Sequence, residues 1–205
     1  LKSSVFAIYD ISKLIFKDAS ISFPISYLNK CWTPQMLDPA YTINPKTGKI
    51  VFSFPSEKNL YIYDYKTDKV DEIEVGYTQY FKEIEPFTYC EEVPKKIDDY
   101  FLNTPSYLTI VYDTYRDIYY RLFFLPPKEV HVGMRSSHTH KRIGLTIYNN
   151  NFEKLYETLF DPYEFSPTDY FMTKEGLWLS KNNPENPDFD ENFFQFALLS
   201  LKENE

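Results

Sequence analysis

The side chains that could do chemistry are concentrated in one short stretch, Ile110 to Arg121, which reads IVYDTYRDIYYR. Alternation along a strand would place Asp113 and Asp117 on one face and Arg116 on the other. Tyrosine rings and arginine–carboxylate contacts suit a polar pocket for a sugar or a peptide. The competing interpretation is structural, with the arginines paired to carboxylates in a sheet and the tyrosines packed between sheets. The candidate ligand-binding residues are Tyr112, Asp113, Tyr115, Arg116, Asp117, Tyr120 and Arg121.

Three histidines, His131, His138 and His140, fall within ten residues of one another and are the candidate metal ligands. A His-x-His pair on an extended segment places both rings on one face, and a third histidine would complete a zinc site. The residues between them offer no Cys, Asp or Glu, so a solvated hairpin loop is the competing interpretation. An oxygen-rich segment further on, Asn183 to Glu191, would suit calcium, but its spacing is not that of an EF-hand and its two prolines favour a rigid turn.

Motifs for nucleophilic and phosphate chemistry are absent from the sequence. There is no Gly-x-Ser-x-Gly elbow and no glycine-rich phosphate loop. Aspartate and glutamate are plentiful, at 30 residues, so a carboxylate pair for glycoside hydrolysis stays open, although no spacing singles one out. We expect no cofactor.

Composition limits the class of protein. The net charge of −8 argues against a nucleic-acid binder, which needs a basic surface, and against docking on anionic lipid. No apolar run approaches the ~20 residues of a membrane-spanning helix. The two cysteines, Cys31 and Cys90, can form a disulfide or remain two thiols. The first residues show no signal peptide, so either a targeting segment has been removed or the chain starts inside a larger protein.

Alternating hydrophobic residues predict strands along most of the chain. The clearest case is Lys49 to Val75, which indicates three strands joined by two tight turns, the last strand being so charged that it belongs at a sheet edge. Ile8-Tyr9-Asp10, Ile62-Tyr63-Asp64 and Ile147-Tyr148-Asn149 each end a strand and enter a turn. The repeated unit is four strands in a meander, and 13 strands are expected in all. A short helix is expected over 94–102.

Four-stranded units in a row are typical of a β-propeller. We therefore predict an all-β chain forming the C-terminal half, about three to four blades, of a six-bladed ring. The chain would be a single domain over 1–205, with blades at approximately 1–39, 40–106, 107–168 and 169–205. The competing fold is a complete β-sandwich of two sheets.

The stretch IVYDTYRDIYYR, together with Gly176 to Ser180 (GLWLS) and Glu157 to Phe160 (ETLF), resembles an uncharacterised family of TolB-like six-bladed β-propeller proteins. Members of that family are bacterial, and most are predicted lipoproteins of the cell envelope. The resemblance implies a location in the periplasm or on an outer-membrane anchor, and it carries over no reaction and no catalytic residue.

Taken together, these observations predict a non-enzymatic binding or scaffolding module of the bacterial cell envelope, with a protein, peptide or glycan as ligand. The alternative is a propeller hydrolase or lyase acting on a glycan or peptide. A third interpretation is a structural subunit whose open sheet edges pair with another chain. We expect the missing half of the ring, or self-association, to supply the partner.

Overall fold

The computed structural model describes residues 4–88, 94–129 and 137–201. Thirteen strands in this part of the chain form four antiparallel sheets. Sheet I holds β1 (Ala7–Asp10) and β2 (Ile15–Asp18). Sheet II holds β3 (Ala40–Asn44), β4 (Lys49–Ser53), β5 (Leu60–Asp64) and β6 (Lys69–Ile73). Sheet III holds β7 (Ser106–Asp113), β8 (Ile118–Leu125), β9 (Arg142–Asn149) and β10 (Lys154–Leu159). Sheet IV holds β11 (Tyr170–Thr173), β12 (Gly176–Ser180) and β13 (Phe196–Leu199).

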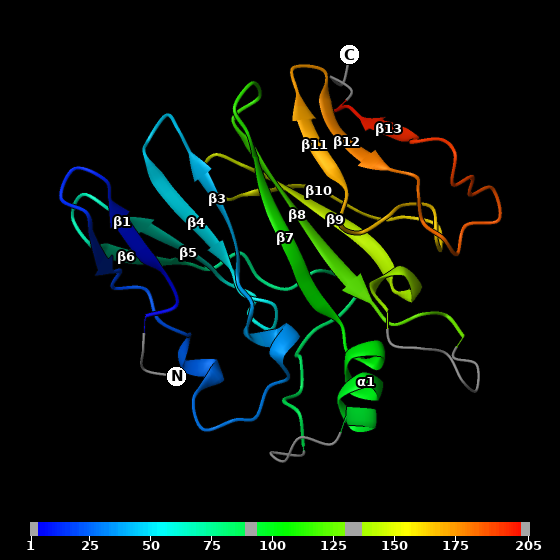
Figure 1. Ribbon diagram of the computed structural model, residues 1–205, viewed down its shortest axis with the longest axis horizontal. Coiled ribbons are helices and arrows are strands. Elements are labelled where there is room, and N and C mark those ends of the chain that lie inside the picture. Colours follow the sequence, from blue (N-terminus) through cyan, green and yellow to red (C-terminus); the bar gives the residue numbers. More distant parts are fainter. Residues whose placement is uncertain (1–3, 89–93, 130–136, 202–205) are drawn as a thin grey trace.

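Each sheet is a meander in which strands that follow one another in sequence lie side by side. The sheets themselves follow one another across the molecule in chain order (Figure 1). Helix α1 (Pro94–Asn103) precedes β7, as its sequence predicted. Strand β6 lies at an edge of sheet II, which confirms the position that its charged residues indicated. Short 3-10 helices at Ile25–Tyr27, Pro34–Leu37 and His138–His140 lie in the connections.

The prediction of a β-propeller is wrong, and so is the prediction of half a six-bladed ring. The structure is all-β, but its sheets have two, four, four and three strands, and none closes or curls into a barrel or propeller. The competing two-sheet sandwich is not observed either. Alternation and turn residues report which strands pair within a sheet. They carry no information on how successive sheets are placed, because this depends on contacts between residues far apart in the sequence.

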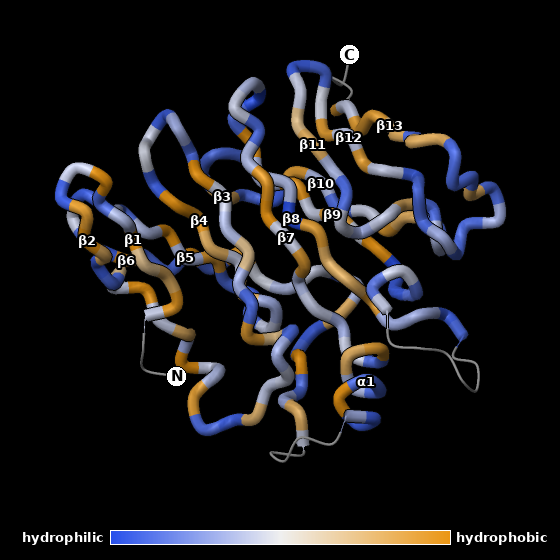
Figure 2. The backbone as a smooth tube through the Cα atoms, viewed as in Figure 1, coloured by the Kyte–Doolittle hydropathy of each residue, from blue (hydrophilic) through white to orange (hydrophobic). Residues whose placement is uncertain are grey.

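One hydrophobic cluster holds each pair of neighbouring sheets together. Phe52 and Tyr63 of sheet II pack with Ala19 and Ile21, which follow β2. Between sheets II and III the cluster includes Val51, Leu60, Ile110, Tyr112, Tyr119 and Tyr148. Between sheets III and IV it includes Tyr120, Leu122, Leu145, Ile147, Leu177 and Leu179. Figure 2 shows the hydrophobic residues along the strands and hydrophilic residues in most hairpin turns.

Strand β8 is the centre of this arrangement, because all eight of its residues are buried. Its even-numbered side chains, such as Tyr120 and Leu122, face sheet IV. Its odd-numbered side chains, such as Tyr119, face the opposite way, toward sheet II. The period of two therefore separates neighbouring residues of the candidate site onto opposite faces of sheet III.

In the part of the chain that the structure describes, no helix is both long enough and apolar enough to cross a membrane.

Candidate functional site

The central residues of the candidate site form the tight turn that joins β7 to β8. The buried carboxylate of Asp113 accepts hydrogen bonds from the backbone N–H of Tyr115 at 2.9 Å and of Arg116 at 3.1 Å. The N–H of Asp117 donates to the carbonyl of Asp113 at 2.8 Å, and Asp117 has a φ of 59°. An aspartate that caps its own turn, followed by a residue in the left-handed region, is a hairpin device. Asp113 therefore holds the backbone of its own loop.

The same turn recurs in other hairpins, two of which are in sheet II. Asn44 accepts from the N–H groups of Lys46 and Thr47 and is followed by Gly48 with a φ of 71°. Asp64 accepts from Lys66 and Thr67 and is followed by Asp68 with a φ of 57°. The sequence signal is an Asp or Asn, three residues, and then a residue that tolerates positive φ. These turns indicate that the acidic residues of the β7–β8 turn stabilise the turn itself.

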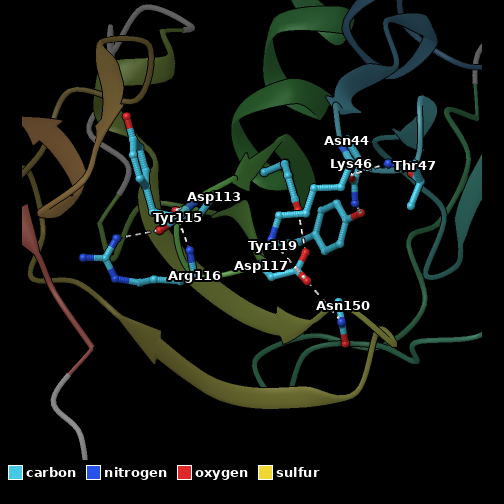
Figure 3. Close-up of polar contacts among 10 residues, drawn as sticks. Asn44, Lys46, Thr47, Asp113, Tyr115, Arg116, Asp117, Tyr119 and Asn150 are labelled. Atoms are coloured by element: carbon cyan, nitrogen blue, oxygen red, sulfur yellow. Dashed lines mark hydrogen bonds and ion pairs between the residues drawn. The ribbon is translucent and has the colours of Figure 1, made fainter.

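Two of these turns also carry a tyrosine–aspartate pair that connects neighbouring sheets. The hydroxyl of Tyr112 donates to Asp117 Oδ1, and Lys46 Nζ of the β3–β4 turn lies 3.4 Å from Asp117 Oδ2 (Figure 3). In the same way Tyr63 donates to Asp68 at 2.8 Å, and Lys17 Nζ of β2 lies 3.2 Å from Asp68 Oδ2. Each aspartate thereby ties its own hairpin to the preceding sheet.

These partners lower the pKa of Asp117, chiefly through the hydrogen bond from the Tyr112 hydroxyl, with Asn150 and Lys46 adding to the effect. Because the folded pKa lies below the unfolded value, the stabilisation is present above that unfolded value and is lost as the pH falls through the folded pKa. At neutral pH Asp117 is therefore an ionised group held by its own chain.

We expect the substitution Asp117→Ala to lower the melting temperature by roughly 2–6 °C, because alanine is disfavoured at positive φ and offers no acceptor. Asp117→Asn keeps both the tolerance for positive φ and an acceptor oxygen for Tyr112, so it should cost less. Thermal melts followed by circular dichroism measure both. Equal losses in the two variants would show that the backbone conformation and the Tyr112 contact contribute nothing.

Arg116 connects sheet III to sheet IV. Its Nη1 donates to Asp113 Oδ2 at 2.9 Å, and its Nη2 donates to the carbonyl of Lys174 at 2.8 Å, in the β11–β12 turn. Tyr115 in the same loop is 62% exposed. In Figure 3 the Tyr115 ring points away from the polar contacts of Asp117 and Tyr119.

Arg121 lies on the other side of the sheet and is fully buried. Its guanidinium donates to Ser53 Oγ at 2.9 Å, to the Lys58 carbonyl at 2.8 Å and to the Glu57 carbonyl at 2.7 Å. Its Cζ also lies 3.2 Å from the centre of the Tyr107 ring. Arg121 thus fastens β8 to the β4–β5 connection of sheet II, and it is not available to a ligand.

Tyr120 points toward sheet IV, away from Arg121. Its side chain is 1% exposed, and its hydroxyl has no hydrogen-bond partner among the described residues. Burial raises the pKa of Tyr120 to about 12, so the hydroxyl stays protonated and can donate. The seven candidate residues are therefore not one pocket. Five of them surround the β7–β8 turn, while Tyr120 and Arg121 occupy opposite faces of sheet III.

The two histidines that the structure describes have different surroundings. His131 lies outside the described residues. His138 packs between the rings of Phe101 and Phe124, and burial lowers its pKa, with the neighbouring Lys141 adding to the effect. His140 Nδ1 lies 3.7 Å from Glu185 Oε1. Within the described ranges no three His, Cys, Asp or Glu side chains are grouped as metal ligands.

The oxygen-rich segment near the C-terminus forms turns. The buried Asn183 donates to the carbonyls of Thr139 and Phe165 at 3.2 and 3.0 Å. Asn186 and Asp190 accept from the backbone N–H groups two residues further on. These oxygens stabilise the local backbone, as the competing interpretation for this segment expected.

Lys141 is a buried cation that sequence reasoning missed. It is 1% exposed, and its Nζ donates to the carbonyls of Phe101 and Thr104 at 2.6 Å each, at the C-terminal end of α1. Burial lowers the pKa of Lys141 to about 7. No pattern in the sequence marks this lysine, because its partners lie about 40 residues away.

Cys31 is disulfide-bonded. Of the two states that the sequence left open for this residue, a disulfide or a thiol, the structure therefore has the disulfide. Cys90 lies outside the described residues.

The comparisons with known proteins identify a family. The model of a domain of unknown function, DUF4221, matches residues 2–159. A crystal structure described as a member of this family from Bacteroides vulgatus is similar, with a TM-score of 0.73 and 23% sequence identity, a likeness that shows the fold alone. The match covers 98% of this chain and 56% of that one, so the chain spans a little over half the length of that relative. No curated protein matches the chain. Since the family model covers well over half of the residues, the chain belongs to the DUF4221 family, whose function is unknown.

Proposed function

We propose that this protein is a non-enzymatic binding or scaffolding module of the bacterial cell envelope and that it contacts a protein partner through the β1–β2 hairpin. The observation that carries this proposal is the set of large apolar side chains exposed on the hairpin. Ile11, Leu14 and Phe16 are 79%, 71% and 75% exposed, and the ring of Tyr9 lies 4.7 Å from that of Phe16 across the strands. Contiguous exposed apolar side chains are typical of interaction surfaces.

The contacts that the charged side chains make within the chain support a binding role over a catalytic one. Asp113, Arg116, Asp117, Arg121 and Lys141 all make short contacts with their own chain, described above. A catalytic group must be free to meet a substrate. These side chains are instead used to join hairpins, sheets and the end of α1.

One cavity among the described residues bears on the alternative function, a hydrolase. A cavity of about 170 Å³ is lined by Asp38, Ser106 and His138, among others. These residue types form acyl-transfer triads elsewhere. In the described residues no hydrogen bond joins the three, and His138 instead packs on aromatic rings. The binding role is therefore favoured.

The envelope location is supported by the disulfide at Cys31. Disulfides persist in oxidising compartments such as the bacterial periplasm and are rare in the cytosol. An extracytoplasmic binding module would encounter its partner under these conditions.

Site-directed photo-cross-linking tests the proposed function. A photoreactive phenylalanine analogue at position 16 should form a discrete adduct with a protein in an envelope extract of the source bacterium. Excess unlabelled protein should compete with the adduct, and the Phe16→Asp variant should not. The same analogue at position 115 is the matched control, because Tyr115 is similarly exposed but lies in a polar turn. No adduct at position 16, or identical adducts at both positions, would contradict the proposal.

A further inference from the structure

The edge of sheet IV is a candidate binding surface that is independent of the β1–β2 hairpin. Sheets II and III each have four strands, whereas sheet IV has three, with β13 at its edge. Strand β13 pairs with β12 from Leu177↔Leu199 to Ser180↔Phe196, and no other strand of the described residues pairs with it. A strand edge exposes unpaired N–H and C=O groups, which another extended segment can use.

The face of sheet III beside this edge is only partly covered. Ile147 pairs with Tyr120 on one side and with Tyr156 on the other, so the three side chains share one face. Tyr120 and Ile147 are buried in the cluster with sheet IV, but Tyr156 on β10 is 54% exposed. Sheet IV therefore covers β8 and β9 but ends short of β10.

A hollow of about 310 Å³ occupies the uncovered position. Its walls are mostly apolar, and they come from sheet III on one side and from the end of β13 on the other. The lining includes Tyr120, Leu145, Ile147, Tyr156, Phe160, Leu198 and Leu201. Several of these residues belong to the cluster between sheets III and IV, so the hollow continues an interface that already exists.

The hydroxyl of Tyr120 supplies a second observation that points to an occupant. The Tyr120 side chain lines the hollow, and its buried hydroxyl has no hydrogen-bond partner in the part of the chain that the structure describes. A buried polar group without a partner is costly, and such groups are rare in native structures. An acceptor placed in the hollow would complete this hydrogen bond.

We propose that an extended segment of a partner protein, with an apolar side chain at every second position, adds to the free edge of β13 as a fourth strand. Its backbone pairs with β13, its inward side chains fill the hollow, and one of its acceptors takes the hydrogen bond of Tyr120. A strand fits better than a helix, because only extended backbone satisfies the edge while presenting alternate side chains to one face. This surface is separate from the β1–β2 hairpin.

The test uses a fluorescent eight-residue peptide of alternating valine and threonine with a terminal lysine, titrated into the purified protein. We expect saturable binding that weakens at least tenfold when the peptide amides facing β13 are N-methylated, because this removes donors and keeps the side chains. Leu198→Glu should weaken binding by a similar factor. Leu155→Glu is the matched control, because Leu155 is 52% exposed on β10 but does not line the hollow, and it should bind normally.

The Tyr120→Phe variant separates a binding role from a structural one. It should weaken peptide binding about three- to tenfold without lowering the melting temperature of the free protein, since the hydroxyl has no partner to lose and its removal relieves the cost of burying an unpaired polar group. Three results would overturn the proposal: no saturable binding, equal binding of the N-methylated peptide, or a dimer that Leu198→Glu disrupts and the peptide does not. The last result would identify a second copy of this chain as the occupant.

Discussion

Replacing Arg121 by methionine will lower the free energy of unfolding by about 3–5 kcal/mol. The substitution keeps an apolar stem of similar length but removes the donors to Ser53, Lys58 and Glu57, so two buried acceptors and one partly buried acceptor lose these hydrogen bonds. It also removes the contact with the Tyr107 ring. Urea denaturation of the wild type and the variant, with the same slope for both, measures the difference.

Arg142→Met is the matched control. Its Nε donates to the Pro126 carbonyl at 2.9 Å, and its side chain is only partly buried. The expected cost is about 1 kcal/mol, as for a single hydrogen bond. A loss at Arg121 no larger than the loss at Arg142 would show that sheets II and III are held by their apolar cluster alone.

The second large expected effect is a pH dependence of the free energy of unfolding that arises from Lys141. Burial lowers its folded pKa to about 7 from an ordinary value of 10.5, so between these values the unfolded state binds more protons than the folded state. Stability must therefore rise with pH in this window, by about 2 kcal/mol between pH 7 and pH 9. The nearby His138 has its pKa lowered from 6.5 and titrates below this range. Tyrosines with raised pKa values affect stability only above their unfolded pKa of about 10.

Urea titrations at pH 7, 8 and 9 measure this slope. Lys141→Met should abolish the rise, whereas Lys69→Met, at an exposed position on β6, should preserve it. A flat profile in the wild type would mean that the carbonyls of Phe101 and Thr104 keep the ammonium charged. An unchanged profile in Lys141→Met would assign the slope to other groups.

Local sequence patterns were sufficient for the strands and turns but not for the arrangement of the sheets. The alternation in Lys49–Ser53 and Leu60–Asp64 and the charges of Lys69–Ile73 each fix a strand and its place in sheet II. The propeller prediction failed because a meander of four strands is compatible with several ways of packing one sheet on the next. That choice is made by contacts within clusters such as the one that contains both Val51 and Tyr148, which are nearly 100 residues apart in the sequence.

The candidate site, too, could be predicted from local sequence patterns only in part. The turn role of Asp113 is visible in the sequence, because Asp64 and Asn44 open identical turns. The separation of Tyr120 from Arg121 also follows from alternation along a strand. The carbonyls that hold Arg121 could not have been predicted, because they lie 63 and 64 residues away in a connection without a recognisable pattern.

The repeated hairpin turns have a kinetic consequence. Within each sheet every strand pairs with its neighbour in sequence, so the contact order inside a sheet is low, and individual hairpins of this kind form in microseconds. The contacts between sheets are different, since Asn44 donates to the Tyr119 hydroxyl across 75 residues and Arg116 reaches Lys174 across 58. Closing these long loops costs more entropy and is slower. We therefore expect the folding barrier to lie in the docking of the sheets on one another, and we expect the contacts of Arg121 to form at that step.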